Sequence, residues 1–112
     1  RISEELCINI WLKRDDLSGF ILSGNKVRKL EYLLAKAKAK AKAKGASWII
    51  TCGGLQSNHC RATAFACAVL GLKCHLVLRD GDKRESGNLF LDALAGAKVS
   101  VIPPAEYAKS AE

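Results

Sequence analysis

The amino-acid sequence predicts an α/β fold of three layers, in which a parallel sheet is joined by right-handed strand–helix–strand crossovers. Three short runs rich in β-forming residues lie at 48–52, 74–78 and 99–102. The stretches between them, at 58–70 and 89–94, have helical character. Strands that alternate with helices form parallel sheets, and their crossovers are right-handed in nearly all known proteins.

The composition is that of an ordinary globular protein. The chain has 112 residues, enough for one compact domain. Five of its lysines lie in an Ala-Lys run at 35–44, and without them the net charge of +7 becomes 7 − 5 = +2, so the basic character belongs to one segment. No apolar stretch approaches membrane-spanning length, and no secretory signal is visible. The chain begins at Arg1 without a methionine and ends without a closing element, so we expect a fragment whose carboxy-terminal remainder is missing.

The cysteines do not form a recognisable disulfide or zinc pattern. Their number is odd, and no Cys-x-x-Cys pair occurs. We therefore expect buried free thiols in a reducing compartment and no metal site. The five residues are Cys7, Cys52, Cys60, Cys67 and Cys74.

The first 25 residues predict a strand followed by a turn. Apolar and polar residues alternate within 7–13, which is typical of a strand. The polar stretch at 14–19 predicts a turn. Ser23-Gly24-Asn25 then supplies a flexible glycine and two possible helix caps.

A helix is predicted from about Lys26 to Lys44, with Gly45 as its stop. Alanine and lysine both favour helix, so the Ala-Lys run continues an amphipathic helix in which alanine is the buried contact and the lysines fall off the apolar face. The residues that share the apolar face are Leu30, Leu33, Leu34, Ala37 and Ala41.

The remaining elements follow from apolar runs and their glycine stops. Trp48–Cys52 is typical of a buried parallel strand. Ser57 or Asn58 can cap the next helix, which Gly71 ends. Gly96 ends the last predicted helix before the third strand.

The loop after the first parallel strand is a candidate binding site. Ligands collect at the carboxyl ends of parallel strands, and two consecutive glycines at 53–54 let a backbone approach one closely. The helix start offers N–H groups to an anion. A turn and a cap explain only part of the polar cluster that follows, so we interpret the loop as functional. The cluster consists of Gln56, Ser57, Asn58 and His59.

A second polar concentration lies at 23–29. Lysine is unusual in the first turn of a helix because its charge opposes the helix dipole. The same field favours the neutral amine that forms Schiff bases, which makes Lys26 a candidate nucleophile. From spacing alone, a solvated basic turn is the preferred interpretation of these residues.

Five motifs in order resemble the D-cysteine desulfhydrase and 1-aminocyclopropane-1-carboxylate deaminase family. They read WLKRDDLSG, SGNKVRKLEYLLA, GGLQSNHCRATA, LGLKCHLVL and GNLFLDALAGAKV, and they cover nearly the whole chain. The resemblance implies the tryptophan synthase β-like fold, in which two α/β domains enclose pyridoxal 5′-phosphate. Residues 1–25 would then belong to the larger domain, and residues 26–112 would comprise the lysine-bearing helix and part of the smaller domain.

The resemblance also implies roles for the polar residues. Lys26 matches the lysine that binds the cofactor covalently, and Lys29 matches a lysine near the cofactor phosphate. Asn58 matches the asparagine that hydrogen-bonds the hydroxyl of the pyridine ring and lies at the substrate. Ser57 matches a catalytic serine at the substrate, which acts as nucleophile or base.

Two further positions bear on the substrate. Gln56 and His59 match residues that flank the substrate carboxylate. The QSNH sequence with Arg61 and Thr63 resembles the desulfhydrase branch, because the deaminase branch carries glutamine at the position of His59. A helix residue facing water remains the alternative for His59. The family's glycine-rich phosphate loop and its partner for the pyridine nitrogen lie outside this chain.

These observations favour a lyase that converts D-cysteine to pyruvate, ammonia and hydrogen sulfide. We expect it to be a cytoplasmic homodimer as the full-length protein, or a mitochondrial one if a targeting segment precedes Arg1, without membrane or nucleic-acid partners. The fragment alone should be inactive. The alternatives are deamination of 1-aminocyclopropane-1-carboxylate, a non-catalytic paralogue that binds small molecules, and a nucleic-acid-binding module built on the Ala-Lys helix. The last lacks the arginine and aromatic residues typical of such modules.

Overall fold

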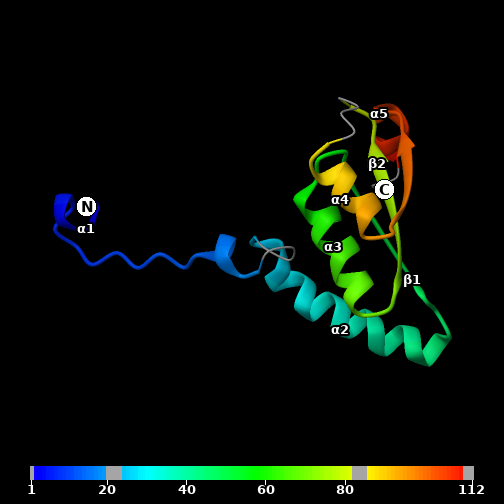
Figure 1. Cartoon of the computed structure of the whole chain (residues 1–112), viewed down its shortest axis with the longest axis horizontal. Coiled ribbons are helices and arrows are strands. Elements are labelled where there is room, and N and C mark those ends of the chain that lie inside the picture. Colours follow the sequence, from blue (N-terminus) through cyan, green and yellow to red (C-terminus); the bar gives the residue numbers. More distant parts are fainter. Residues whose placement is uncertain (1, 20–23, 82–85, 110–112) are drawn as a thin grey trace.

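The computed structural model describes residues 2–19, 24–81 and 86–109. An extended arm leads from the amino terminus into a small α/β body (Figure 1). The elements in chain order are α1 (Ile2–Glu5), the 3₁₀ helix η1 (Asp15–Leu17), α2 (Lys26–Lys44), β1 (Trp48–Gly54), α3 (Asn58–Val69), β2 (Lys73–Arg79), α4 (Asn88–Leu94), β3 (Lys98–Ile102) and α5 (Pro104–Lys109).

The three strands form a parallel sheet in the order β1-β2-β3. Helices α3 and α4 connect the strands and pack on one face, and α2 packs against α3 (Figure 1). Helix α5 lies on the other face, where the guanidinium of Arg79 is 5.8 Å from the ring centre of Tyr107. Arg79 points away from the helices because the side chain of its neighbour Leu78 is buried beneath them. The predicted three-layer α/β architecture is therefore confirmed.

Helix α2 begins and ends where the sequence predicts. Gly45 adopts φ +65° directly after it, which is the left-handed stop that glycine allows. Leu30 and Leu34 are buried on its inner face, whereas Leu33 is 53% exposed, so the prediction that Leu33 shares the buried stripe is wrong. Leu33 lies at the edge of the stripe and lines a cavity between α2, β1 and the start of α3, so its side chain is only partly covered. The side chain of Ala41 lies outside the described residues.

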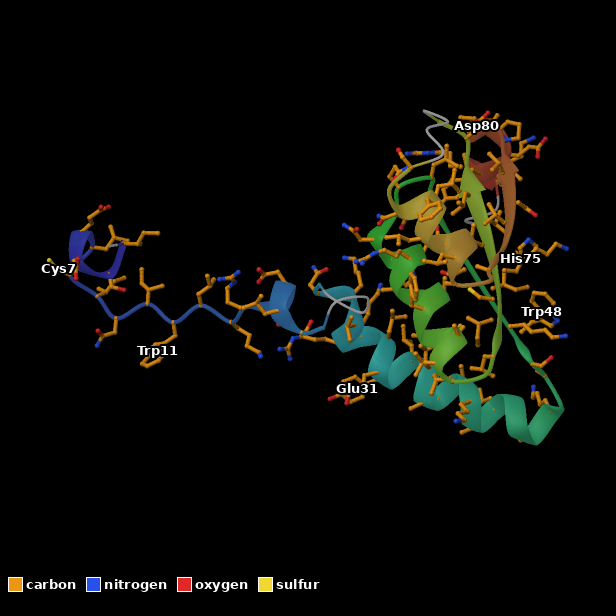
Figure 2. All side chains as sticks on the ribbon, viewed as in Figure 1. Cys7, Trp11, Glu31, Trp48, His75 and Asp80 are labelled. Atoms are coloured by element: carbon orange, nitrogen blue, oxygen red, sulfur yellow. The ribbon has the colours of Figure 1, made fainter. Side chains whose placement is uncertain are left out.

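The predicted strand at 7–13 does not form. This segment is extended, but no described strand of the chain pairs with it, so its backbone N–H and C=O groups lack the partners that a sheet requires. Cys7 adopts a positive φ of 52° at its start. Trp11 projects from the arm and is 94% exposed (Figure 2).

The β1 strand is parallel as predicted, but it is buried on one face only. Ile49 and Thr51 face the helices, whereas Ile50 is 68% exposed on the opposite face. Trp48 and His75 also lie on the side of the sheet away from α3 (Figure 2). Cys52 shares this open face, so the expectation that it is buried is wrong. A continuous apolar run cannot distinguish a strand covered on both faces from one covered on a single face.

The core lies between the helical face of the sheet and α3. It contains mainly leucines, alanines and the buried thiols of Cys60, Cys67 and Cys74. All five cysteines are free, as predicted, but Cys7 on the arm is exposed like Cys52, so the expectation of burial is wrong for both. Within the described ranges, no three or more metal-ligating side chains cluster together. None of the helices in this part of the chain combines the length and apolar character that crossing a membrane requires.

One charged residue, Asp92 of α4, is fully buried in this core. Neither carboxylate oxygen has a hydrogen-bond partner among the described residues. Burial raises the pKa of Asp92 to about 7, and the positive charge of Arg61 opposes this shift. The folded protein therefore holds a proton on Asp92 at pH values where the unfolded chain, with a pKa near 3.8, has lost it.

We predict that the free energy of unfolding depends less on pH in Asp92→Asn than in the wild-type protein. Between about pH 4 and pH 7 the folded state binds more protons than the unfolded state, so the stability contributed by Asp92 falls as pH rises through this window. The stability of the wild-type protein relative to Asp92→Asn should fall by roughly 2–4 kcal/mol between pH 4 and pH 8. Urea unfolding of both proteins at the two pH values measures this difference. Parallel pH profiles would contradict a buried, titrating Asp92.

Candidate functional site

The predicted site residues lie at the amino-terminal ends of two neighbouring helices. Lys26 is the first residue of α2 and is half-buried, and Lys29 is exposed one turn later. Gln56 lies in the turn after β1, and Ser57 is the N-cap of α3. Asn58 is the first residue of α3.

The turn before α3 folds back closely onto the end of β1. Ser57 N–H donates to the carbonyl of Gly54 at 3.0 Å, and Ser57 Oγ accepts from Cys60 N–H at 3.2 Å. A Cβ atom on Gly53 would lie 2.6 Å from Cys60 Sγ and 2.8 Å from Ser57 Oγ. A larger residue at this position would require the side chains of Ser57 and Cys60 to shift. Gly53 is therefore required by the packing of the fold. Apart from its chain neighbours, no atom of the described residues lies within 4 Å of a Cβ built on Gly54.

The side chain of His59 packs between α2 and β1. Its Nε2 lies 3.1 Å from Thr51 Oγ1, and its backbone carbonyl accepts from Thr63 Oγ1 at 2.8 Å. Burial lowers the pKa of His59, and the charges of Lys29 and Lys26 lower it further. The half-buried ring is therefore neutral at pH 7. Both lysines act electrostatically on this first turn of α3, which brings the two predicted clusters together.

In the first turn of α2 the arginine has an acidic partner, whereas the two lysines do not. Arg28 Nε donates to Asp15 Oδ2 at 2.9 Å, and this contact lowers the pKa of Asp15. Asp15 also accepts Gly24 N–H through its backbone carbonyl at 2.8 Å, so it holds the turn that leads into α2. Among the described residues, neither Lys26 nor Lys29 has an ion-pair or hydrogen-bond partner. Their positive charges remain available to a ligand.

The α4 end of the site contains a residue to which the sequence analysis assigned no role. Asn88 Nδ2 donates to the backbone carbonyl of Gln56 at 2.8 Å and to Asn58 Oδ1 at 2.9 Å. The side chain of Gln56 is also engaged: its Nε2 donates to the carbonyl of Ser86 at 3.0 Å, and its Oε1 accepts from Asn88 N–H at 2.8 Å. Asn88 is the second residue of the motif GNLFLDALAGAKV, and its distance of 30 residues from Asn58 concealed the contact.

Comparison with known proteins gives a consistent assignment. The pattern of a family described as pyridoxal-phosphate dependent enzyme matches residues 1–112. A Thermotoga maritima protein, provisionally named 1-aminocyclopropane-1-carboxylate deaminase, is 53% identical over 107 residues, which are 96% of this chain and 33% of that protein. The Arabidopsis thaliana protein named bifunctional D-cysteine desulfhydrase/1-aminocyclopropane-1-carboxylate deaminase, mitochondrial, is 50% identical over 88% of this chain and 25% of its own length.

A solved structure shares the fold. The crystal structure of a homologue of 1-aminocyclopropane-1-carboxylate deaminase superposes with a TM-score of 0.74 and 44% identity, over 90% of this chain and 30% of that one. The chain thus spans between a quarter and a third of the length of these proteins.

We predict that Gly53→Ala and Gly54→Ala have different effects although the glycines are adjacent. Gly53→Ala forces Ser57 and Cys60 away from β1 and should lower the free energy of unfolding by roughly 1–3 kcal/mol. Gly54→Ala is the matched control and should change it by less than about 0.5 kcal/mol. Urea unfolding monitored by circular dichroism measures both. Equal effects would show that the close approach at Gly53 does not limit the packing of α3.

Proposed function

This chain belongs to the pyridoxal-phosphate-dependent enzyme family, and we propose that it supplies the lysine-bearing part of a lyase acting on a small amino acid. The observation that carries the proposal is the pair of unpartnered cations, Lys26 and Lys29, beside the first turn of α3. D-cysteine is the substrate we favour, and 1-aminocyclopropane-1-carboxylate is the alternative. Relatives bear both names.

The donor groups of the site suit an anionic, phosphorylated cofactor. Lys26 would bind pyridoxal phosphate covalently through Nζ, and Lys29 would face its phosphate. The Nδ2 group of Asn58 has no hydrogen-bond partner among the described residues, because Asn88 engages only its Oδ1. Asn58 would therefore donate to the ring hydroxyl. The bound cofactor stabilises the carbanion formed when an amino acid loses a proton at Cα.

The neighbouring residues would bind and orient the amino acid. The first N–H groups of a helix have no intrahelical partners. Because Ser57 Oγ already accepts Cys60 N–H, the N–H groups of Asn58 and His59 are the ones that would bind the substrate carboxylate. Ser57 Oγ accepts Cys60 N–H as the helix cap, and its hydroxyl would donate to the substrate. Gln56 would shape this side of the site through its backbone, since its side chain is already engaged.

The choice of D-cysteine depends on His59. Its neutral ring lies against Thr51, so it is not the solvent-facing side chain of the alternative interpretation. We propose that it borders the substrate carboxylate, as in the desulfhydrase branch. D-cysteine and water would then give pyruvate, ammonia and hydrogen sulfide.

The organisation of the whole protein is also a proposal. We assign residues 1–25 to a larger domain and residues 26–112 to a smaller one. The exposed apolar side chains of Ile8, Ile10 and Trp11 support this division, because an extended segment that exposes them suits a strand of a separate sheet. We further propose a homodimer in the cytoplasm.

The first prediction of this proposal concerns Lys26 in the whole protein. Borohydride should reduce the bond between the cofactor and the protein, and mass spectrometry should place the adduct on the Lys26 peptide. Lys26→Ala should abolish the adduct. Lys36→Ala is the matched control, because this exposed lysine lies on the same helix beyond the site, and it should leave the adduct intact. An adduct on another lysine would refute the assignment.

The second prediction separates Ser57 from Asn58. Ser57→Ala removes a hydroxyl at the substrate, so turnover should fall while the absorbance of the bound cofactor persists. Asn58→Ala removes a donor to the ring, so the absorbance itself should shift, with a loss of binding energy of about 1–3 kcal/mol. Spectra and steady-state kinetics of the two variants test this. Unchanged spectra and kinetics in both would mean that the loop is only a turn and a cap.

A further inference from the structure

We infer that Asn88 is a positioning residue that fixes the orientation of the Asn58 side-chain amide, so that Asn58 offers the cofactor a hydrogen-bond donor. This inference rests on the proposed function, because it concerns the contact between Asn58 and the ring hydroxyl. Asn88 lies on α4, which contains none of the residues proposed above to touch the cofactor.

The geometry of the Asn88 side chain leaves one arrangement. A primary amide has two N–H donors, and Asn88 Nδ2 uses them on the carbonyl of Gln56 at 2.8 Å and on Asn58 Oδ1 at 2.9 Å. The carbonyl of Gln56 can only accept, so the NH₂ group of Asn88 must face it. The same NH₂ group then requires an acceptor from Asn58. Asn58 therefore turns its oxygen toward Asn88 and keeps Nδ2 for another partner.

The position of Asn88 is itself fixed from both sides. Its backbone N–H donates to Gln56 Oε1 at 2.8 Å, while Gln56 Nε2 donates to the carbonyl of Ser86 at 3.0 Å. Gly87 lies against this amide with φ +63°, and a Cβ there would be 2.6 Å from Gln56 Oε1. We call this set the Asn88 clasp. It comprises Gln56, Asn58, Ser86, Gly87 and Asn88.

The orientation of Asn58 has a chemical consequence. A donor beside the ring hydroxyl stabilises its deprotonated, anionic form, whereas an acceptor stabilises the protonated form. The clasp therefore favours loss of the hydroxyl proton. Lys26 and Lys29 on α2 favour the same anion, and His59 on α3 is neutral. These three groups are unchanged in the variants described below.

The test replaces Asn88 in the whole protein. Asn88→Asp keeps the backbone N–H but presents only acceptors, so Asn58 must turn Nδ2 toward the carboxylate and Oδ1 toward the ring. The absorbance titration of the bound cofactor should move to higher pH by about one unit. Cofactor affinity, measured by equilibrium dialysis, should fall about tenfold. Asn88→Ala only frees Asn58 to rotate, so it should cause a smaller change in the same direction without a new charge.

Ser86→Ala is the matched control. Ser86 contributes its backbone carbonyl to the clasp, so removal of its hydroxyl should leave the spectrum, the affinity and the melting temperature unchanged. If Asn88→Asp does not fold cooperatively, Asn88→Ala decides. Wild-type titration and affinity in the folded variant, with or without a lower melting temperature, would overturn the inference and leave Asn88 a structural residue. Failure of the wild-type protein to bind pyridoxal phosphate would instead overturn the proposed function and this inference with it.

Discussion

The close approach of α3 to the carboxyl end of β1 at Gly53 is the contact from which the site is built. The Ser57 cap and the Cys60 thiol lie where any side chain at residue 53 would be. Because of this contact, the amino terminus of α3 lies at the carboxyl end of β1. Gln56, Ser57 and Asn58 therefore lie together there. A bulkier residue would push the helix away from the sheet, and the donors of the first turn would no longer converge. The packing of the body and the chemistry of the site thus share one steric constraint.

The charges at the first turns of α2 and α3 make the site positive. Asp15 binds Arg28 and also holds the turn before α2, so the arginine is neutralised by a structural partner. The neighbouring lysines have no such partner among the described residues. Burial and these lysine charges together keep His59 uncharged. The result is a region with a surplus of positive charge and N–H donors, which is the environment that a phosphate and an ionised ring hydroxyl require.

Two surfaces of the chain remain uncovered by its own described residues. One is the amino-terminal arm, on which Trp11 is exposed. The other is the face of the sheet opposite α3, on which Ile50 is exposed. The relatives are three to four times as long as this chain, as the coverage of 25–33% implies. The proposed division of residues 1–25 and 26–112 between two domains would account for the arm, and for an apolar alternating segment that pairs with no described strand.

The amino-acid sequence alone determined α2, the three parallel strands, the two helices between those strands, and the order of these elements. The bounds of α2, the parallel strands and the glycine stops follow from propensities and periodicities that act over a few residues, and the five motifs were sufficient to indicate the family. Contacts distant in sequence decided the rest. Leu33 and Cys52 are exposed because burial depends on which face a neighbouring element covers. The contact between Asn58 and Asn88 joins side chains 30 residues apart, and only the packing of α4 beside α3 brings them within hydrogen-bonding distance.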